Sequence, residues 1–200
     1  MRIIAGKWGG RRITAPSGQD TRPTGDRMRE SLFSSLHSRI GSFESLRVLD
    51  GFAGSGALGL EALSRGAAFL ASVESNPKTC RIIEDNYMNL QGISHSSDIN
   101  PEQFRLCRGD IFKLSPRLQN LAVDIAFFDP PYDLSADKMH DLLQQLAETK
   151  VFAYGALIII ERAKTVQSED LLPSSFTELD TKTKGSTTLH FARFDAQLNV

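Results

Sequence analysis

The sequence has 200 residues, of which 40% are hydrophobic and 24% charged, and its formal net charge is −1. These values are typical of one globular domain with at most a small addition. No apolar run approaches the ~20 residues that span a bilayer, and the first residues lack the apolar core of a signal peptide. Two cysteines without CxxC spacing and four scattered histidines exclude a disulfide framework and argue against a metal site. We therefore expect a reducing, cytoplasmic protein without a bound metal.

The first 24 residues are rich in Gly, Pro, Arg and Thr and predict a small hairpin or irregular arm. Residues 1–40 contain eight Lys and Arg against three acids, whereas the other 160 residues are acidic overall. A basic arm on an acidic body indicates a polyanionic partner, although an ordinary solvated segment would have the same composition. The candidate RNA-binding residues are Arg2, Lys7, Arg11, Arg12, Arg22, Arg27 and Arg29.

A helix follows the arm and opens the main domain, which we predict to span residues 25–200. Thr24 or Asp26 can cap this helix. Its apolar residues recur at a spacing that places them on one helical face: Met28, Leu32, Phe33, Leu36 and Ile40.

From residue 46 onward, strands and helices alternate. We predict strands at 46–50, 69–74, 105–110, 123–128 and 155–161, and helices at 57–65, 77–90 and 136–150, with a polar loop at 91–104. Two further strands, 176–180 and 187–194, have no helix between them. Such alternation predicts an α/β fold with a mostly parallel seven-stranded sheet covered by helices, and the closing pair requires an antiparallel strand.

A glycine-rich turn joins the first predicted strand to the next helix. Glycines there let the backbone N–H groups approach a ligand at the start of the helix. Gly54, Gly56 and Gly59 also match GxGxxG, and Glu74 lies where a ribose-binding acid belongs, so a nicotinamide dehydrogenase is a rival on this motif alone. Asp50 at the strand end favours S-adenosylmethionine, because its carboxylate would repel a pyrophosphate but attract an ammonium group.

The candidate cofactor-binding residues follow from this turn and from the ends of the neighbouring strands. Glu74 suits the ribose hydroxyls, and Asp110 suits the adenine amino group, although Asp110 equally well caps a helix beginning at Ile111. The full set is Asp50, Phe52, Ala53, Gly54, Ser55, Gly56, Glu74 and Asp110.

The tetrapeptide Asp129-Pro130-Pro131-Tyr132 follows the fourth predicted strand, at the sheet edge where ligands bind in open α/β folds. The prolines fix the backbone and remove two N–H donors. The Asp129 carboxylate and the Pro130 carbonyl can accept the N–H hydrogens of an exocyclic base amine, and Tyr132 offers a face for stacking an extruded base. Asp-Pro-Pro alone could also be an ordinary turn. The catalytic interpretation becomes strong only in combination with the glycine-rich turn upstream.

The chain resembles the RsmD-type 16S rRNA guanine-N2 methyltransferases. The resemblance rests on Met1–Ile4 with Gly6, Gly10 and Arg11, on Arg22–Thr24 with Asp26, Arg27, Arg29 and Glu30, on Asp50 and Phe52–Arg65, and on Asp129–Tyr132. Three features depart from the family pattern. Gly51 replaces a larger residue, the 95–103 insertion is long, and the C-terminal third matches only in pattern.

The resemblance implies a Rossmann-like class I methyltransferase fold that uses S-adenosylmethionine. It also implies methylation of one guanine N2 in 16S rRNA of the small ribosomal subunit or of its assembly intermediate. From the sequence we further expect a monomer that does not bind membranes. The alternatives are a DNA adenine-N6 methyltransferase and a catalytically idle RNA-binding assembly factor. A protein glutamine methyltransferase would call for Asn in place of Asp129. Two questions stay open: whether Arg29 and Glu30 contact cofactor or RNA, and whether Trp8 packs in the hairpin or stacks on RNA.

Overall fold

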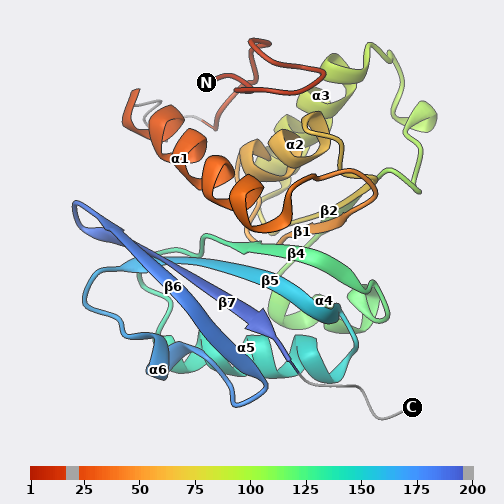
Figure 1. The fold of residues 1–200 in the computed structure, drawn as a ribbon. Helices are drawn as coiled ribbons and strands as arrows, with labels where there is room; N and C mark the ends of the chain where they lie inside the picture. The colour runs from red at the N-terminus through yellow and green to blue at the C-terminus, as the bar shows by residue number, and fades with distance from the viewer. Residues whose placement is uncertain (17–22, 196–200) are drawn as a thin grey trace. The chain divides into compact units, whose positions relative to one another are not determined.

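The computed structural model describes residues 1–16 and 23–195, which form two compact units, Met1–Gly109 and Asp110–Val200 (Figure 1). Arg22, one of the predicted RNA-binding residues, lies outside the described residues. The boundary predicted between residues 24 and 25 stays a prediction. Within the described ranges, no helix is long and apolar enough to cross a membrane.

The N-terminal unit is built on three parallel strands in the order β3-β2-β1. Leu70 and Ala71 in the central strand are fully buried, and α2 and α3 pack against the strands. The elements are α1 (Pro23–Ile40), β1 (Arg47–Asp50), α2 (Ala57–Ser64), β2 (Phe69–Glu74), α3 (Pro77–Gln91), the short 3₁₀ helix η1 (Ser96–Asp98) and β3 (Phe104–Arg108).

Local sequence signals explain where these elements begin and what they bury. Asn76 caps α3 by accepting from the backbone N–H groups of Lys78 and Thr79, and Pro77 occupies the first helical position. Leu32, Phe33 and Leu36 form the predicted apolar face of α1 and are at most 4% exposed. The spacing of these residues therefore correctly predicts which face of α1 is buried.

The C-terminal unit contains four strands in the order β4-β5-β7-β6. β4 and β5 are parallel, whereas β7 runs antiparallel to both of its neighbours. In Figure 1, α4 and α5 lie on the same side of β4 and β5. The elements are α4 (Ile111–Leu118), β4 (Val123–Phe128), α5 (Ala136–Glu148), β5 (Phe152–Ala163), α6 (Ser168–Leu171), β6 (Phe176–Lys184) and β7 (Thr187–Phe194).

The predicted fold class is confirmed: the sheet has seven strands and is mostly parallel, with an antiparallel last strand. Several boundaries differ from prediction. The third strand ends at Arg108 rather than at Asp110, because Asp110 caps α4. The fifth strand begins three residues early, because a register irregularity between Val123 and Ile125 accommodates the extra chain around Gly155. The helix α4 begins at Ile111, as the alternative role of Asp110 as a helix cap predicts, whereas the four-residue helix α6 was not predicted.

Candidate active site

The glycine-rich turn after β1 is held from beneath by Asp50. This carboxylate is 2% exposed, and its Oδ2 accepts from the N–H of Gly59 over 3.0 Å. A Cβ at Gly59 would lie 2.6 Å from the end of the Leu70 side chain and 3.2 Å from Asp50, so a larger residue there would have to displace Leu70. Gly54 and Gly56 have positive φ angles of 52° and 78°, a conformation that favours glycine.

Glu74, at the end of β2, joins this turn to the next helix. Its Oε2 accepts from the N–H of Gly54 over 3.0 Å, and its Oε1 accepts from the N–H of Asn76 over 2.7 Å. Each carboxylate oxygen has two lone pairs, so these bonds leave Glu74 with capacity to accept from ribose hydroxyls. Ala53 adds a backbone bond to Val73, so the turn has a defined shape beside an acceptor, as a cofactor carrying an ammonium and a ribose requires.

Asp110 has the role of a helix cap. Its Oδ1 accepts from the N–H of Phe112 over 3.1 Å at the start of α4, and the residue is exposed. The preceding residue, Gly109, donates its N–H to the Glu74 carbonyl over 2.8 Å. A contact between Asp110 and adenine stays a prediction.

The N-terminal arm is tied to α2 through the buried Glu61. This side chain is 0% exposed and accepts from the N–H groups of Ile4, over 2.6 Å, and Ala5, over 3.0 Å. Arg65 donates to Glu61 over 2.7 Å, and the N–H of Lys7 donates to the Ser64 carbonyl over 2.7 Å. The predicted hairpin exists as a closed loop with a bridge between residues 2 and 12.

Trp8 and Asn86 fasten the arm to α3. Trp8 is 4% exposed and meets Tyr87 edge-on at 6.4 Å, and Tyr87 stacks on Phe104 at 4.2 Å. Trp8 is therefore a packing residue. Asn86 exchanges hydrogen bonds of 2.8 Å with the backbone of Thr14 and donates to the Ser55 carbonyl over 3.1 Å. Through Asn86, the arm and the glycine-rich turn share one anchor.

The predicted RNA-binding residues fall into two groups. Arg11 donates to the carbonyls of Asn89 and Leu90, and Arg29, which is 7% exposed, donates to the carbonyl of Arg2 over 2.6 Å and to Asp26 over 3.0 Å. These two guanidinium groups hold the fold together. Arg11 is itself exposed, and so are the other members of the set, Arg2, Lys7, Arg12 and Arg27.

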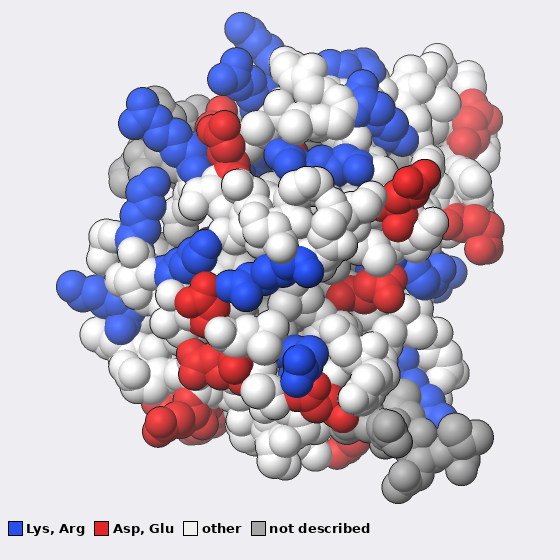
Figure 2. Space-filling view, in the orientation of Figure 1, with Lys and Arg blue, Asp and Glu red and all other residues white. Residues whose placement is uncertain are grey.

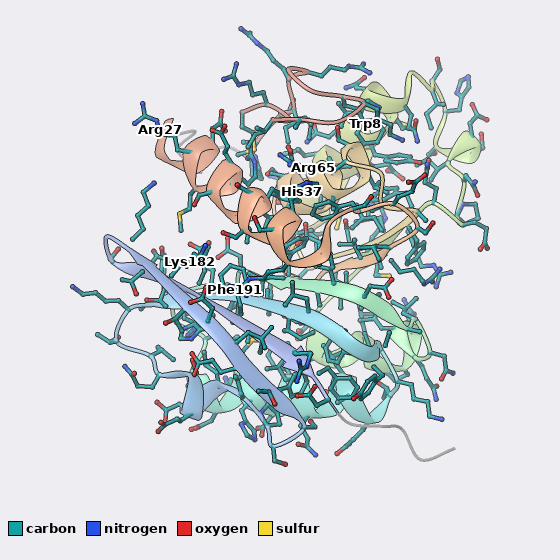
Figure 3. All side chains as sticks on the ribbon, viewed as in Figure 1. Trp8, Arg27, His37, Arg65, Lys182 and Phe191 are labelled. Carbon is teal, nitrogen blue, oxygen red and sulfur yellow. The ribbon has the colours of Figure 1, made fainter. Side chains whose placement is uncertain are left out.

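The exposed group makes one face of the N-terminal unit basic. Figure 2 shows Lys and Arg gathered over the arm and α1, and Figure 3 shows Arg27 near the start of α1, pointing outward. The Nζ of Lys7 lies 4.2 Å from the centre of the Trp8 ring, and partial burial lowers the pKa of Lys7. Cations on a rigid support suit phosphate binding.

In the C-terminal unit, the Asp129–Tyr132 tetrapeptide follows β4 directly. Phe128 pairs with Ile160 on β5, so Asp129 emerges beside Glu161 at the ends of two parallel strands. Tyr132 is 74% exposed, which is rare for an aromatic side chain and leaves its ring open for stacking.

Arg162 holds this loop from β5. Its Nη1 donates to the carbonyl of Pro131 over 3.3 Å and its Nη2 donates to the carbonyl of Leu134. The side chain is 4% exposed, and burial lowers its pKa while the charge of Asp129 opposes that shift. Arg162 therefore fixes two backbone positions of the loop and supplies a positive charge next to its carboxylate.

The two carboxyls at these strand ends have raised pKa values. Asp129 is solvent-exposed, yet the many protein atoms around it remove part of its hydration and raise its pKa to about 6, against the charge of Arg162. Loss of hydration and the negative charge of Asp129 raise the pKa of Glu161 to about 7. Burial and the charge of Arg162 act in opposite directions on the pKa of Asp129, and perturbed pKa values of this kind are typical of functional sites.

Glu161, Arg162, Glu61 and Asn86 were not singled out from the sequence. Glu161 and Arg162 close an apolar strand, and charge at a strand end is a signal that could have identified them. Glu61 and Asn86 lie within amphipathic helices, where polar residues are ordinarily solvated, so only the three-dimensional packing identifies them. Among the described residues, no cluster of three or more His, Cys, Asp or Glu could hold a metal.

The fold is that of the S-adenosylmethionine-dependent methyltransferases. A candidate methyltransferase of Escherichia coli has a TM-score of 0.77 at 29% identity, covering 98% of this chain and 99% of that one. A second candidate methyltransferase, solved in complex with S-adenosylhomocysteine, has a TM-score of 0.64 at 16% identity over 84% of this chain and 48% of that one. At that identity, the second structure supports the fold alone.

The chain belongs to the family described as conserved hypothetical protein 95, whose profile matches residues 1–193, and this is the RsmD family that the motifs predict. It is 32% identical over 185 residues to the ribosomal RNA small subunit methyltransferase D of Haemophilus influenzae, covering 92% of this chain and 89% of that protein. The residues that the family profile matches include the basic arm, the glycine-rich turn and the Asp129–Tyr132 loop.

Proposed function

We propose that the protein transfers a methyl group from S-adenosylmethionine to the exocyclic N2 of a guanine in 16S rRNA of the small ribosomal subunit. The observation that carries the proposal is the Asp129–Tyr132 loop, which presents a carboxylate and an open aromatic ring and is clamped by Arg162. The relatives named ribosomal RNA small subunit methyltransferase D support rRNA as the substrate. Such a substrate is in the cytoplasm, as the cysteine content suggests.

S-Adenosylmethionine, when bound, supplies an electrophilic methyl group. Glu74 would hold its ribose, and the turn at residues 51–56 would lie against its methionine end, with Asp50 shaping the turn and attracting the ammonium. The remaining acceptor capacity of Glu74 supports this fit. A Cβ at Gly56 would lie 3.2 Å from Leu60 and 3.3 Å from Ile83, so the turn packs closely on α2 and α3. Asp110 near the adenine completes the proposed cofactor site.

The protein's own contribution to the reaction is positioning and charge. A guanine amine is a weak nucleophile because its lone pair is delocalised into the ring. Asp129 and the Pro130 carbonyl accept its two N–H hydrogens, which orients the nitrogen toward the methyl group. Tyr132 stacks on the extruded base, worth ~1–3 kcal/mol. Asp129 then takes the proton that the methylated nitrogen releases, a role that its raised pKa suits.

The RNA would first meet the basic face formed by Arg2, Lys7, Arg12 and Arg27. Folded RNA is recognised through phosphates, 2′-hydroxyls and splayed bases, and an arm fixed to α2 and α3 is a rigid platform for such contacts. Arg11 and Arg29 would support this platform, because their guanidinium groups bind backbone carbonyls.

The test is methyl transfer from radiolabelled S-adenosylmethionine to 30S subunits lacking the modification, to naked 16S rRNA and to duplex DNA, with the labelled nucleoside identified by mass spectrometry. We expect N2-methylguanosine from rRNA or subunits. N6-Methyladenine from DNA would reassign the substrate. Cofactor binding without label in any substrate would instead favour an idle assembly factor.

A further inference from the structure

The hairpin of β6 and β7 carries its charges in two separate groups. Glu178 and Asp180 lie in the first half of β6, whereas Lys182 and Lys184 lie in its second half, next to the turn. Residues 181–194 contain no acid, although residues 110–200 carry an excess of acids overall. Lys182 and Lys184, which we call the hairpin lysines, are both exposed and make this end of the hairpin basic.

The register of the sheet brings this basic end to the edge where the Asp129–Tyr132 loop lies. The parallel strands β4 and β5 end at this edge, and β6 ends there as well, because β7 runs antiparallel to both β5 and β6. Leu189 on β7 pairs with Glu161 on one side and with Lys182 on the other. Figure 1 shows the turn between β6 and β7 at this edge, beyond the end of β5. Because neighbouring strands are about 4.8 Å apart, Lys182 lies about 14 Å across the sheet from the end of β4.

The hairpin lysines lie on the same face of the sheet as Glu161. Directly paired residues carry their side chains on one face, and Leu189 is paired with both Glu161 and Lys182. The Nζ of Lys182 lies 5.9 Å from the ring centre of Phe191, which is two residues from Leu189 along β7 and so shares its face (Figure 3). Lys184 follows two residues after Lys182 on the same strand. Both ammonium groups are therefore carried on the face that Glu161 occupies at the strand ends.

The basic end of the hairpin has a fixed backbone. The N–H of Lys164, after the end of β5, donates to the carbonyl of Ser186 in the turn over 2.9 Å. The hydroxyl groups of Thr183 and Thr188 lie 2.8 Å apart and join the two strands of the hairpin. A surface on paired strands loses little backbone freedom when a ligand binds, so less of the binding free energy is spent on ordering it.

The edge at which we propose that guanine enters is acidic. Asp129 and Asp133 follow β4 and are exposed, and Glu161 lies near the end of β5. RNA carries one negative charge per nucleotide, so the phosphates that flank the target would be repelled from this edge unless cations lay nearby. Arg162 is buried and donates to two loop carbonyls, so it is already engaged. The hairpin lysines are exposed cations on the same face at the same edge.

The spacing of the hairpin lysines suits an RNA backbone. Two residues apart on a strand, they are separated by about 6.8 Å, close to the distance between successive phosphates along an RNA strand. Each lysine is a point charge on a flexible stem, which suits contacts to phosphate that carry no sequence information. Within residues 1–16 and 23–195, Lys184 takes part in no ion pair. Ser186 is exposed in the turn and adds a hydroxyl donor.

We propose that the basic end of the β6–β7 hairpin binds the RNA strand that carries the target guanine, with Lys182 and Lys184 on phosphates a few nucleotides away from it. The inference rests on the proposed function, because it assumes that RNA enters beside Asp129. It assigns RNA contacts to a segment that is remote in sequence from the basic arm. The arm would supply affinity for the folded substrate, and the hairpin would direct one strand across the acidic edge.

Cross-linking tests where the RNA lies. Lys184→Cys, labelled with a photoreactive azidophenacyl group and bound to 30S subunits that lack the modification, should form adducts with 16S rRNA in the strand that carries the methylated guanine. Lys150→Cys is the matched control, since Lys150 is exposed and precedes β5 at the opposite edge of the sheet, and it should give at least tenfold less adduct. Wild-type protein treated in the same way measures the background from Cys80 and Cys107. Adducts with ribosomal proteins alone, or equal yields from the two variants, would overturn the proposal.

The salt dependence of binding tests the phosphate contacts. The double variant Lys182→Gln with Lys184→Gln should bind 30S subunits about threefold to thirtyfold more weakly, with kcat at saturating subunits unchanged. Its slope of log affinity against log salt should be smaller by about 1.4, because each phosphate contact on a single strand contributes about 0.7. Arg117→Gln with Lys150→Gln removes the same charge from exposed positions that precede β4 and β5, and should leave the slope unchanged. Equal slopes for the two double variants would contradict the phosphate contacts.

Methyl transfer to 30S subunits, measured on the same proteins, separates this inference from the proposed function. Methylation of rRNA by the wild type, without rRNA adducts from Lys184→Cys, would overturn the hairpin proposal alone. Adducts with rRNA in the absence of any methylation would support an RNA-binding hairpin while contradicting the proposed function.

Discussion

The Nη1 of Arg162 donates to the carbonyl oxygen of Pro131 over 3.3 Å and so ties β5 to the loop that follows β4. Arg162 is buried, and its second guanidinium nitrogen reaches the carbonyl of Leu134. A planar fork that binds two carbonyls sets the direction of a loop as well as its position. We therefore regard Arg162 as a positioning residue for Asp129 and Tyr132.

Replacing Arg162 tests this role. Arg162→Lys keeps the charge but loses the fork, so we expect kcat to fall about tenfold and KM for 30S subunits to change little. Arg162→Gln removes the charge too and should lower kcat about a hundredfold. Arg193→Gln, an exposed arginine paired with Asp195 on the same sheet, is the control and should retain full activity. A fall in the Arg162 variants confined to KM would indicate a contact with RNA instead.

Asp129→Ala is expected to bind S-adenosylmethionine normally and to lose at least a hundredfold in turnover, because it removes both the acceptor that orients the amine and the group that takes its proton. Calorimetry measures the binding of the cofactor, and single-turnover methylation measures the chemical step. Full activity in Asp129→Ala would exclude the proposed mechanism.

The raised pKa values of Asp129 and Glu161 predict an acid limb in the rate profile. Asp129 must be ionised to accept, so kcat/KM should fall as pH drops through about 6. Glu161, whose pKa is raised to about 7 in part by the charge of Asp129, is still largely protonated where Asp129 ionises, so Glu161→Gln should leave the limb near the same pH. Profiles of both proteins between pH 5 and 8 test this, and a limb moved to lower pH in Glu161→Gln would show that Glu161 is charged while Asp129 titrates.

The free energy of unfolding should change with pH in the opposite direction to kcat/KM. Because the folded-state pKa of both acids is raised, the folded protein binds more protons than the unfolded chain between about pH 4.5 and 7. The free energy of unfolding contributed by these groups therefore falls as pH rises through that window. Urea titrations of wild type and Glu161→Gln across this range should differ in slope, with the variant less dependent on pH.

The basic residues predict two different phenotypes. Arg12 is exposed, so Arg12→Gln should weaken rRNA binding and reduce the slope of log affinity against log salt by about 1, without changing the melting temperature. Arg29 is 7% exposed and bonded to Arg2 and Asp26, so Arg29→Gln should lower the melting temperature. A salt slope changed equally by both variants would show that Arg29 reaches the RNA.

Periodicity and turn chemistry were enough to predict most of the fold. The strands at 69–74, 123–128 and 187–194 begin and end where predicted, because each is an apolar run bounded by clear breaks. The limits of prediction lie in contacts across the chain. From the sequence, Arg29 and Glu30 could contact either cofactor or RNA. In the structure, the Arg29 guanidinium donates to the backbone carbonyl of Arg2, 27 residues away, and no local sequence pattern predicts this contact.

The same holds for the candidate site. Asp129 and Glu74 are identified by motifs, since each follows a strand at a recognisable spacing. Arg162 is identified only by the register that brings β5 beside β4 and by the carbonyls it meets there. The residues proposed to bind substrate and cofactor therefore show in the sequence, whereas the residues that hold them in place mostly do not.

The docking of the arm can be tested with two glycines of the same conformation. Gly6 and Gly10 have φ angles of 82° and 83°, but a Cβ at Gly6 would lie 1.9 Å from the Ser64 carbonyl oxygen, whereas a Cβ at Gly10 has nothing within 4 Å. Both alanine variants carry a similar backbone penalty, about 1 kcal/mol. Gly6→Ala must also push the arm away from α2 and break the bonds to Glu61 and Ser64. We expect Gly6→Ala to bind S-adenosylmethionine but to lose affinity for 30S subunits at least tenfold, with Gly10→Ala close to wild type. Equal behaviour of the two variants would mean that the arm's position on α2 does not matter for the substrate.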